Sequence, residues 1–183
     1  MIKFIKWLLI IILVLAVIIL IFAFYMGLIS SPSAKEQKLG PYTVVVENFV
    51  GPYMETGKVH DKIYASLKAD GIETFEGIGI YYDDPSKVPP NKCRSTIGVI
   101  IESQDLAKIN RLTKKYKTKN FAVKNYTVVE FPIRNDFSYM IGPMKAYPVL
   151  MGYATAKKYK MSAPMEIYDI PAAKILYVME IIK

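Results

Sequence analysis

The chain opens with a long apolar segment, whereas the rest of the sequence alternates between apolar and polar residues. No charged residue occurs between Trp7 and Ala34, and residues 7–29 are all apolar, aromatic or small. About 20 apolar residues are enough for a helix to cross a bilayer. We expect insertion of this segment to be favourable by on the order of 5 to 9 kcal/mol. The pattern predicts a transmembrane anchor over residues 1–30.

A cleaved signal sequence is the alternative interpretation of this segment. Ser31 and Ser33 have the relative spacing that a signal peptidase accepts, but the apolar core of a signal is roughly half as long. Lysines flank the segment on both sides, so the positive-inside rule favours a cytoplasmic N-terminus only slightly. We expect a single-pass membrane protein whose orientation the sequence leaves open.

The remainder of the chain contains two similar halves. The sequence YTVV at residues 42–45 recurs at 126–129, and IYYDDP at 80–85 has a counterpart in IYDIP at 167–171. In each half, a Val-rich strand is followed by a helical stretch and two further strands. The pattern predicts an α+β fold of tandem βαββ modules with pseudo-twofold symmetry.

The domain boundaries follow from composition and from this repeat. Residues 31–40 are small and polar without periodicity, which is typical of a tether. We expect the folded domain over residues 41–183, divided into repeat one (41–101), a linker (102–120) and repeat two (121–183).

A helix is expected in each repeat. In the first, Val59, Ile63 and Leu67 recur at steps of four within residues 55–70, which gives one buried stripe. In the second, we expect the helix over roughly residues 148–161, because proline is well tolerated in a first helical turn.

Most of the formal net charge of +8 lies in and just after the linker. A solvated surface explains such a run, and contact with anionic lipid, worth about 1 kcal/mol per basic residue, is the functional alternative. We do not expect nucleic acid as a partner, since no aromatic platform is interleaved with the lysines. The residues that would contact lipid are Lys108, Arg111, Lys114, Lys115, Lys117 and Lys119.

The chain has one cysteine and one histidine, which limits its chemistry. Catalysis by a Ser-His-Asp or Cys-His arrangement would need His60, and we expect solvent rather than Cys93 beside it. Cys93 lies in the segment IYYDDPSKVPPNKCRSTIGVII (80–101), whose prolines and aspartates predict a structural hairpin. No cluster has metal-ligand spacing, so we expect no metal and no cofactor.

Glu166 is the best candidate for a functional residue. Glu166 and Tyr168 alternate with apolar residues, so the acid and the ring are expected on one face of a strand. Aligning GIY of repeat one with EIY of repeat two places Gly79 opposite Glu166 and Tyr81 opposite Tyr168. Glycine would leave room beside the acid, and an acid in an aromatic-lined concavity suits a lipophilic cation. The alternative is an exposed glutamate on an edge strand.

These segments resemble a known family. EIYDIP in repeat two and IYYDDPSKVPPNKCRSTIGVI in repeat one are similar to the GyrI-like small-molecule-binding domain, which is also the effector-binding part of multidrug-sensing bacterial regulators. Together with ETGKV (55–59) and the N-terminal apolar segment, they resemble a membrane-anchored branch of this family, which includes a vertebrate endoplasmic-reticulum-phagy receptor.

The resemblance implies two βαββ modules with a groove that binds small molecules, in which a glutamate matching Glu166 contacts cationic ligands. We therefore expect a membrane-anchored, non-enzymatic domain that binds a small lipophilic or cationic molecule through Glu166, Tyr168, Tyr81 and Gly79. Two alternatives stay open: a hydrolase of reactive small molecules that uses the same glutamate, and a scaffold for a protein partner. We do not expect a transcription regulator, because no helix-turn-helix precedes the domain.

Overall fold

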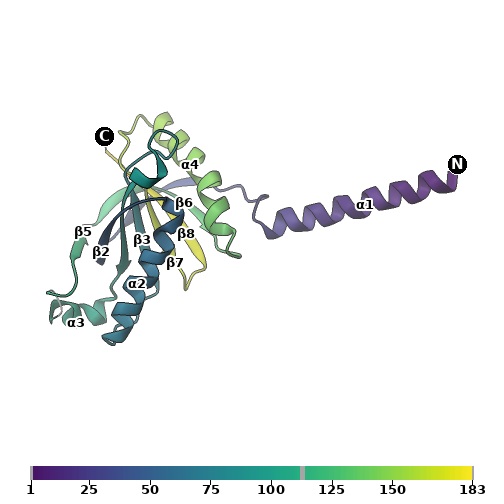
Figure 1. Cartoon of the computed structure of the whole chain (residues 1–183). Helices are drawn as coiled ribbons and strands as arrows, with labels where there is room; N and C mark the ends of the chain where they lie inside the picture. The colour runs from purple at the N-terminus through teal and green to yellow at the C-terminus, as the bar shows by residue number, and fades with distance from the viewer. Residues whose placement is uncertain (1, 112–113, 183) are drawn as a thin grey trace.

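The computed structural model describes residues 2–111 and 114–182 and consists of an α+β domain attached to an N-terminal helix (Figure 1). The first half contains α1 (Ile2–Tyr25), β1 (Ala34–Leu39), β2 (Tyr42–Val50), α2 (Thr56–Ala69), β3 (Glu76–Tyr81) and β4 (Arg94–Ile100). The second half contains α3 (Leu106–Arg111), β5 (Thr118–Phe121), β6 (Lys124–Pro132), α4 (Ser138–Ala156), β7 (Met165–Asp169) and β8 (Lys174–Glu180).

The strands form one antiparallel sheet, curled into a half-barrel, in the order β1-β6-β8-β7-β3-β4-β2-β5. Repeat one is the βαββ unit β2-α2-β3-β4, and repeat two is β6-α4-β7-β8. The two units meet at the β3–β7 pair. Outward from this pair, equivalent strands of the two repeats follow in the same order on both sides. The predicted α+β fold of tandem βαββ modules is confirmed.

Residues 34–39 form an edge strand, so the prediction of a tether over 31–40 is wrong for this segment. β1 pairs with β6, the first strand of repeat two, and β5 pairs with β2, the first strand of repeat one. Each repeat therefore receives its outer strand from the segment that precedes the other repeat. Hydrophobic alternation did not reveal β1 because four of its six side chains face solvent, and its place in the sheet is set by backbone pairing with β6.

Both long helices cover the same face of the sheet. Ile97 on β4 packs under α2 and Tyr177 on β8 packs under α4, and the register connects these two positions through Gly79 and Glu166. Directly paired residues share a face, so the row crosses the sheet beneath both helices. The other face holds a third apolar cluster, which includes Ile78, Met165 and Ile167. The prediction that Glu166 and Met165 face opposite sides of the sheet is confirmed.

The helix of repeat two begins ten residues before the expected start at Pro148. α4 contains both Pro143 and Pro148 in its interior, where proline removes a backbone hydrogen bond. The helix nevertheless continues, because Gly142, Ala146 and Leu150 are buried against the sheet at steps of four. Packing against the sheet therefore outweighs the tendency of the two prolines to end a helix.

The segment 80–101 is a structural hairpin. The Asp83 carboxylate accepts hydrogen bonds from the Arg94 backbone N–H at 2.7 Å and from Nε and Nη2 of the same residue at 2.9 and 2.8 Å. Cys93 is buried, with 1% of its surface exposed, and its Sγ lies 3.6 Å from the carbonyl oxygen of Val88. The thiol is therefore a packed side chain of the hairpin.

α1 is long and apolar enough to cross a membrane over Phe4–Tyr25, by length and composition. None of this stretch is buried against the rest of the molecule. A signal sequence near the N-terminus would meet the same criterion. An apolar helix that could anchor the domain is thus present at the expected place.

Candidate functional site

The carboxylate of Glu166 is buried beneath the two helices. Glu166 is the second residue of β7 and is 6% exposed. The Tyr147 hydroxyl of α4 donates a hydrogen bond to Oε1 at 2.6 Å, and the Tyr168 hydroxyl of β7 donates one to Oε2 at 2.6 Å. The prediction that Glu166 and Tyr168 share a face is confirmed, and the alternative of an exposed edge glutamate is wrong.

Tyr81 extends this arrangement into repeat one. Its hydroxyl oxygen lies 2.9 Å from that of Tyr168. Because the Tyr168 hydroxyl donates its proton to Glu166, it accepts this hydrogen bond from Tyr81. A hydrogen-bonded chain therefore runs from Tyr81 of β3 through Tyr168 to the acid.

Gly79 lies opposite Glu166 in the β3–β7 register, as predicted. The predicted pairing of Tyr81 with Tyr168 is wrong, because Tyr168 lies opposite Gly77. The room that the glycine leaves is occupied by Tyr81, since a Cβ atom on Gly79 would lie 2.7 Å from the Tyr81 hydroxyl oxygen. The expected open space beside the acid is thus filled by an aromatic ring. Gly79 lets this ring fold back over its own strand and reach the neighbouring repeat.

Burial controls the protonation of this group of residues. It raises the pKa of Glu166 above its usual value, although the hydrogen bonds from Tyr147 and Tyr168 act in the opposite direction. Burial and the nearby acid also raise the pKa values of Tyr81, Tyr147 and Tyr168. The phenols therefore keep their protons at neutral pH and can stabilise a negative charge on Glu166.

Sequence reasoning missed Tyr147 and Tyr177. Tyr177 on β8 pairs with Glu166 across the sheet, and its ring lies 5.4 Å from that of Tyr147. Its hydroxyl is buried without a hydrogen-bond partner among the residues that the structure describes. Tyr147 was missed because the predicted helix began one residue later, at Pro148.

His60 also faces the site, so the expectation of solvent around it is wrong. Its ring lies 5.4 Å from the ring of Tyr168 in an edge-on arrangement, and 6.4 Å from that of Tyr64. Both imidazole nitrogens are buried without a hydrogen-bond partner in the described part of the chain. Burial lowers the pKa of His60 to about 4, so the ring is neutral at physiological pH.

This burial predicts a loss of stability in acid. The folded chain keeps His60 neutral down to a pKa of about 4, whereas the unfolded chain protonates it below 6.5. The stabilisation is therefore complete above pH 6.5, and on the order of 3 kcal/mol is lost as the pH falls towards 4. Denaturant titrations of the chain in detergent micelles at pH 7 and pH 4.5 measure this loss.

The variant His60→Gln is the control for this experiment. It should show a smaller change in unfolding free energy between the two pH values, since the sequence has no other histidine. The same pH dependence in both proteins would show that carboxylates, rather than His60, cause the acid sensitivity.

No group of three or more His, Cys, Asp or Glu residues that could hold a metal ion occurs in residues 2–111 and 114–182. An open surface hollow of about 730 Å³ lies where α2 ends, lined among others by Lys68, Phe75 and Lys108. Glu166 is not among its lining residues. The tyrosine-bound acid and this hollow are therefore separate features.

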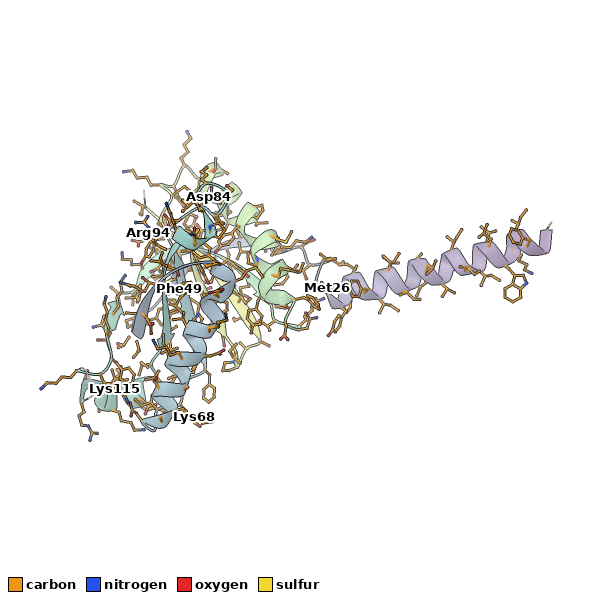
Figure 2. All side chains as sticks on the ribbon, in the orientation of Figure 1. Met26, Phe49, Lys68, Asp84, Arg94 and Lys115 are labelled. Atoms are coloured by element: carbon orange, nitrogen blue, oxygen red, sulfur yellow. The ribbon has the colours of Figure 1, made fainter. Side chains whose placement is uncertain are left out.

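Two of the basic residues of the linker form ion pairs within the domain. Lys108 forms an ion pair with Asp105 at 2.8 Å, and Lys115 forms one with Asp70 at 2.6 Å. Figure 2 places Lys115 at the end of the domain opposite Met26, where α1 joins it. Contact of this segment with the membrane that α1 could cross therefore has no support from the arrangement.

No family model matches the chain. It is similar to the testis-expressed protein 264 homologue of Mus musculus, with 28% identity over 155 residues that cover 80% of this chain and 48% of the mouse protein. The human protein of the same name is 27% identical over 165 residues, which cover 86% and 51%. The chain thus spans about half the length of the curated relatives that it matches.

Solved structures with the same architecture include the EcmrR C-terminal domain, with a TM-score of 0.56 and 14% identity over 83% of this chain and 97% of that one. SAV2435 bound to tetraphenylphosphonium has a TM-score of 0.51 and 12% identity, over 81% and 93%. The fold is GyrI-like. In this GyrI-like fold the β3–β7 junction, where Glu166 lies, is the line along which the two repeats meet.

Proposed function

We propose that this chain is a membrane-anchored GyrI-like domain that binds a small lipophilic cation, with Glu166 as its counter-ion. The observation that carries the proposal is the environment of the carboxylate. It is 6% exposed, and its hydrogen bonds within the described residues come from tyrosines rather than from a basic side chain. A buried carboxyl group without a cationic partner is stabilised by a proton or by a positively charged ligand.

The surrounding aromatic rings support a cation with an apolar surface. Tyr81, Tyr147 and Tyr168 surround the acid, and Tyr139 of α4 lies 6.0 Å from Tyr168 with 42% of its surface exposed. Ring faces attract cations, most strongly where water is excluded. Because side chains fill the space over Glu166, the ligand must displace Tyr147 or Tyr168, and the exposed Tyr139 marks the side from which it enters.

Tetraphenylphosphonium is the appropriate probe, since SAV2435, a protein of similar fold, was solved bound to it. Tetraphenylborate has almost the same shape and the opposite charge. We expect the full chain in lipid nanodiscs to bind the phosphonium and not the borate, measured by equilibrium dialysis with empty nanodiscs as the reference. Equal uptake of both ions would show partitioning into apolar surface and would contradict the proposal.

A protein-binding scaffold is the second candidate, and the filled groove favours it. Tyr81 occupies the space above Gly79, and hydroxyl groups cover both oxygens of Glu166. If neither tetraphenyl ion binds above the nanodisc reference, the buried network has a structural role and the scaffold is the better interpretation. The hydrolase alternative has less support, because the acid is enclosed away from water.

A further inference from the structure

The outer face of α4 is unusually apolar for a helix on the surface of a domain. Exposed residues recur along it at steps of three and four, starting from the N-cap: Phe137, Met140, Met144, Pro148 and Met151. We call this set the α4 stripe. Phe137 is 45% exposed, Met140 51%, Met144 69% and Met151 47%. Contiguous exposed apolar surface of this kind marks an interaction site.

The pseudo-symmetry of the fold provides an internal comparison, because α2 occupies the equivalent position in repeat one. Its outer face carries the charged residues Lys58, Asp61, Lys62 and Lys68, all of which are exposed. α4 is five residues longer than α2 and contains a single charged residue, Lys145. The difference between equivalent helices of one domain shows that the fold itself does not require an apolar outer surface here.

α4 starts beside the end of the apolar N-terminal helix. Nη1 of Arg134 donates a hydrogen bond to the carbonyl oxygen of Phe24 at 2.9 Å, and the guanidinium lies 4.8 Å from the centre of the Phe24 ring. Nδ2 of Asn135 donates to the carbonyl oxygen of Tyr25 at 2.6 Å. These bonds occupy carbonyl groups at the C-terminal end of α1, and α4 begins only three residues after Asn135.

A second contact fixes the same junction. Met26, the first residue after α1, is 9% exposed. Gly27 follows in a left-handed conformation with φ of 76°, and a Cβ atom there would lie 3.4 Å from the ring of Phe131. The residues that follow α1 are therefore packed onto the domain, and no free linker joins the helix to it.

We propose that the α4 stripe lies on the lipid bilayer that α1 crosses and holds the domain against it. Figure 1 shows α4 on the side of the domain from which α1 leaves, and α3 on the opposite side. A helix with an apolar outer face is suited to the boundary between headgroups and acyl chains, where basic flanking residues are also favoured. Lys157 and Lys158, both exposed, follow the end of α4 directly. This inference rests on one part of the proposed function, namely that α1 spans the membrane.

The test uses the full chain with Cys93→Ala, so that single cysteines can carry a nitrobenzoxadiazole label in nanodiscs containing doxyl-labelled lipid. Labels at Met140→Cys and Met144→Cys are expected to lose most of their fluorescence to 5-doxyl lipid, whose quencher lies near the headgroups. A label at Lys68→Cys, which Figure 2 places far from Met26, should keep its fluorescence. A label at Leu15→Cys, in the middle of α1, should be quenched by 12-doxyl lipid.

The label positions distinguish two outcomes: a membrane-spanning α1 without contact between α4 and the bilayer, and an α1 that does not span the membrane. If the label at Leu15→Cys is quenched while the two stripe labels keep their fluorescence as the Lys68→Cys label does, α1 spans the membrane but the α4 stripe does not lie on it. If Leu15→Cys is not quenched, the anchor itself is wrong. A stripe label shielded by a second copy would also escape quenching and would overturn the proposal. In the Met140→Glu/Met144→Glu variant, a label at Met151→Cys should lose its quenching while the unfolding midpoint is retained.

Discussion

The Glu166→Gln variant is expected to bind tetraphenylphosphonium at least about 30-fold more weakly than the unaltered chain, because removing one partner of a buried charge pair costs about 2 kcal/mol or more. Glutamine keeps the size of the side chain and one of the two accepting oxygens, while its amide NH2 takes the place of the other and donates to the facing tyrosine hydroxyl. The loss therefore reports the charge rather than the packing. Equilibrium dialysis of both proteins in nanodiscs measures it.

A matched control separates this local effect from the overall charge of the chain. Glu130→Gln removes the same charge from β6, where the carboxylate is partly exposed and lies 2.7 Å from Lys35 Nζ. We expect this variant to bind the phosphonium as the unaltered chain does. An equal loss in both variants would mean that long-range electrostatics, rather than contact with Glu166, governs the binding.

The pH dependence of binding provides a further signature of the same residue. The usual pKa of a glutamate is 4.5, and burial raises that of Glu166 above this value. A cation binds the ionised form, so affinity should rise with pH through the raised pKa and level off above it. The Glu166→Gln variant should lack this rise. A rise of the same size in the variant would assign the titration to another group.

The Gly142→Ala variant is expected to lose about 3 kcal/mol of stability, the upper part of the usual range for overpacking a core. A Cβ atom at this position would lie 2.2 Å from the Tyr177 hydroxyl oxygen and 3.3 Å from the ring of Phe131. Tyr177 has 0% of its surface exposed and packs against Tyr147, so its ring has nowhere to move. Denaturant unfolding of the chain in detergent micelles measures the change.

The same helix offers a matched control in Gly152. A Cβ atom there would meet no described atom within 4 Å, so Gly152→Ala should stabilise the chain by about 0.5–1 kcal/mol through helix propensity alone. Adding Tyr177→Phe to Gly142→Ala removes the clashing hydroxyl, which has no hydrogen-bond partner among the described residues, and should restore part of the stability. Similar effects of the two alanine substitutions would contradict the close contact between α4 and β8.

The fold could be predicted because its strongest signals are local and repeated. The recurrence of YTVV and of the IYYDDP and IYDIP segments fixes the order of the elements, and the two-residue period of a strand fixes the face of Glu166. Alignment of the repeats then placed Gly79 opposite Glu166, as the register has it. Each of these inferences depends on residues close together in the sequence or on a comparison of one repeat with the other.

The features that were missed depend on contacts between distant segments. β1 is held by backbone pairing with β6, to which its exposed side chains contribute no pattern. The early start of α4 is decided by packing against the sheet, which outweighs two prolines. The space beside Glu166 is filled by Tyr81 and not left open, because the direction of a tyrosine ring is set by neighbours that the sequence does not identify.

The exchange of β1 and β5 makes the two repeats mutually dependent. Neither βαββ unit supplies the outer strand of its own half of the sheet, so an isolated repeat would expose the backbone groups of β2 or of β6 along an unpaired edge. We therefore expect the domain to unfold as one cooperative unit despite its internal duplication. Because β1 is also the first strand after α1, a pull on the apolar helix reaches repeat two by two routes, through the bonds of Arg134 and Asn135 and through the six paired positions of β1 and β6.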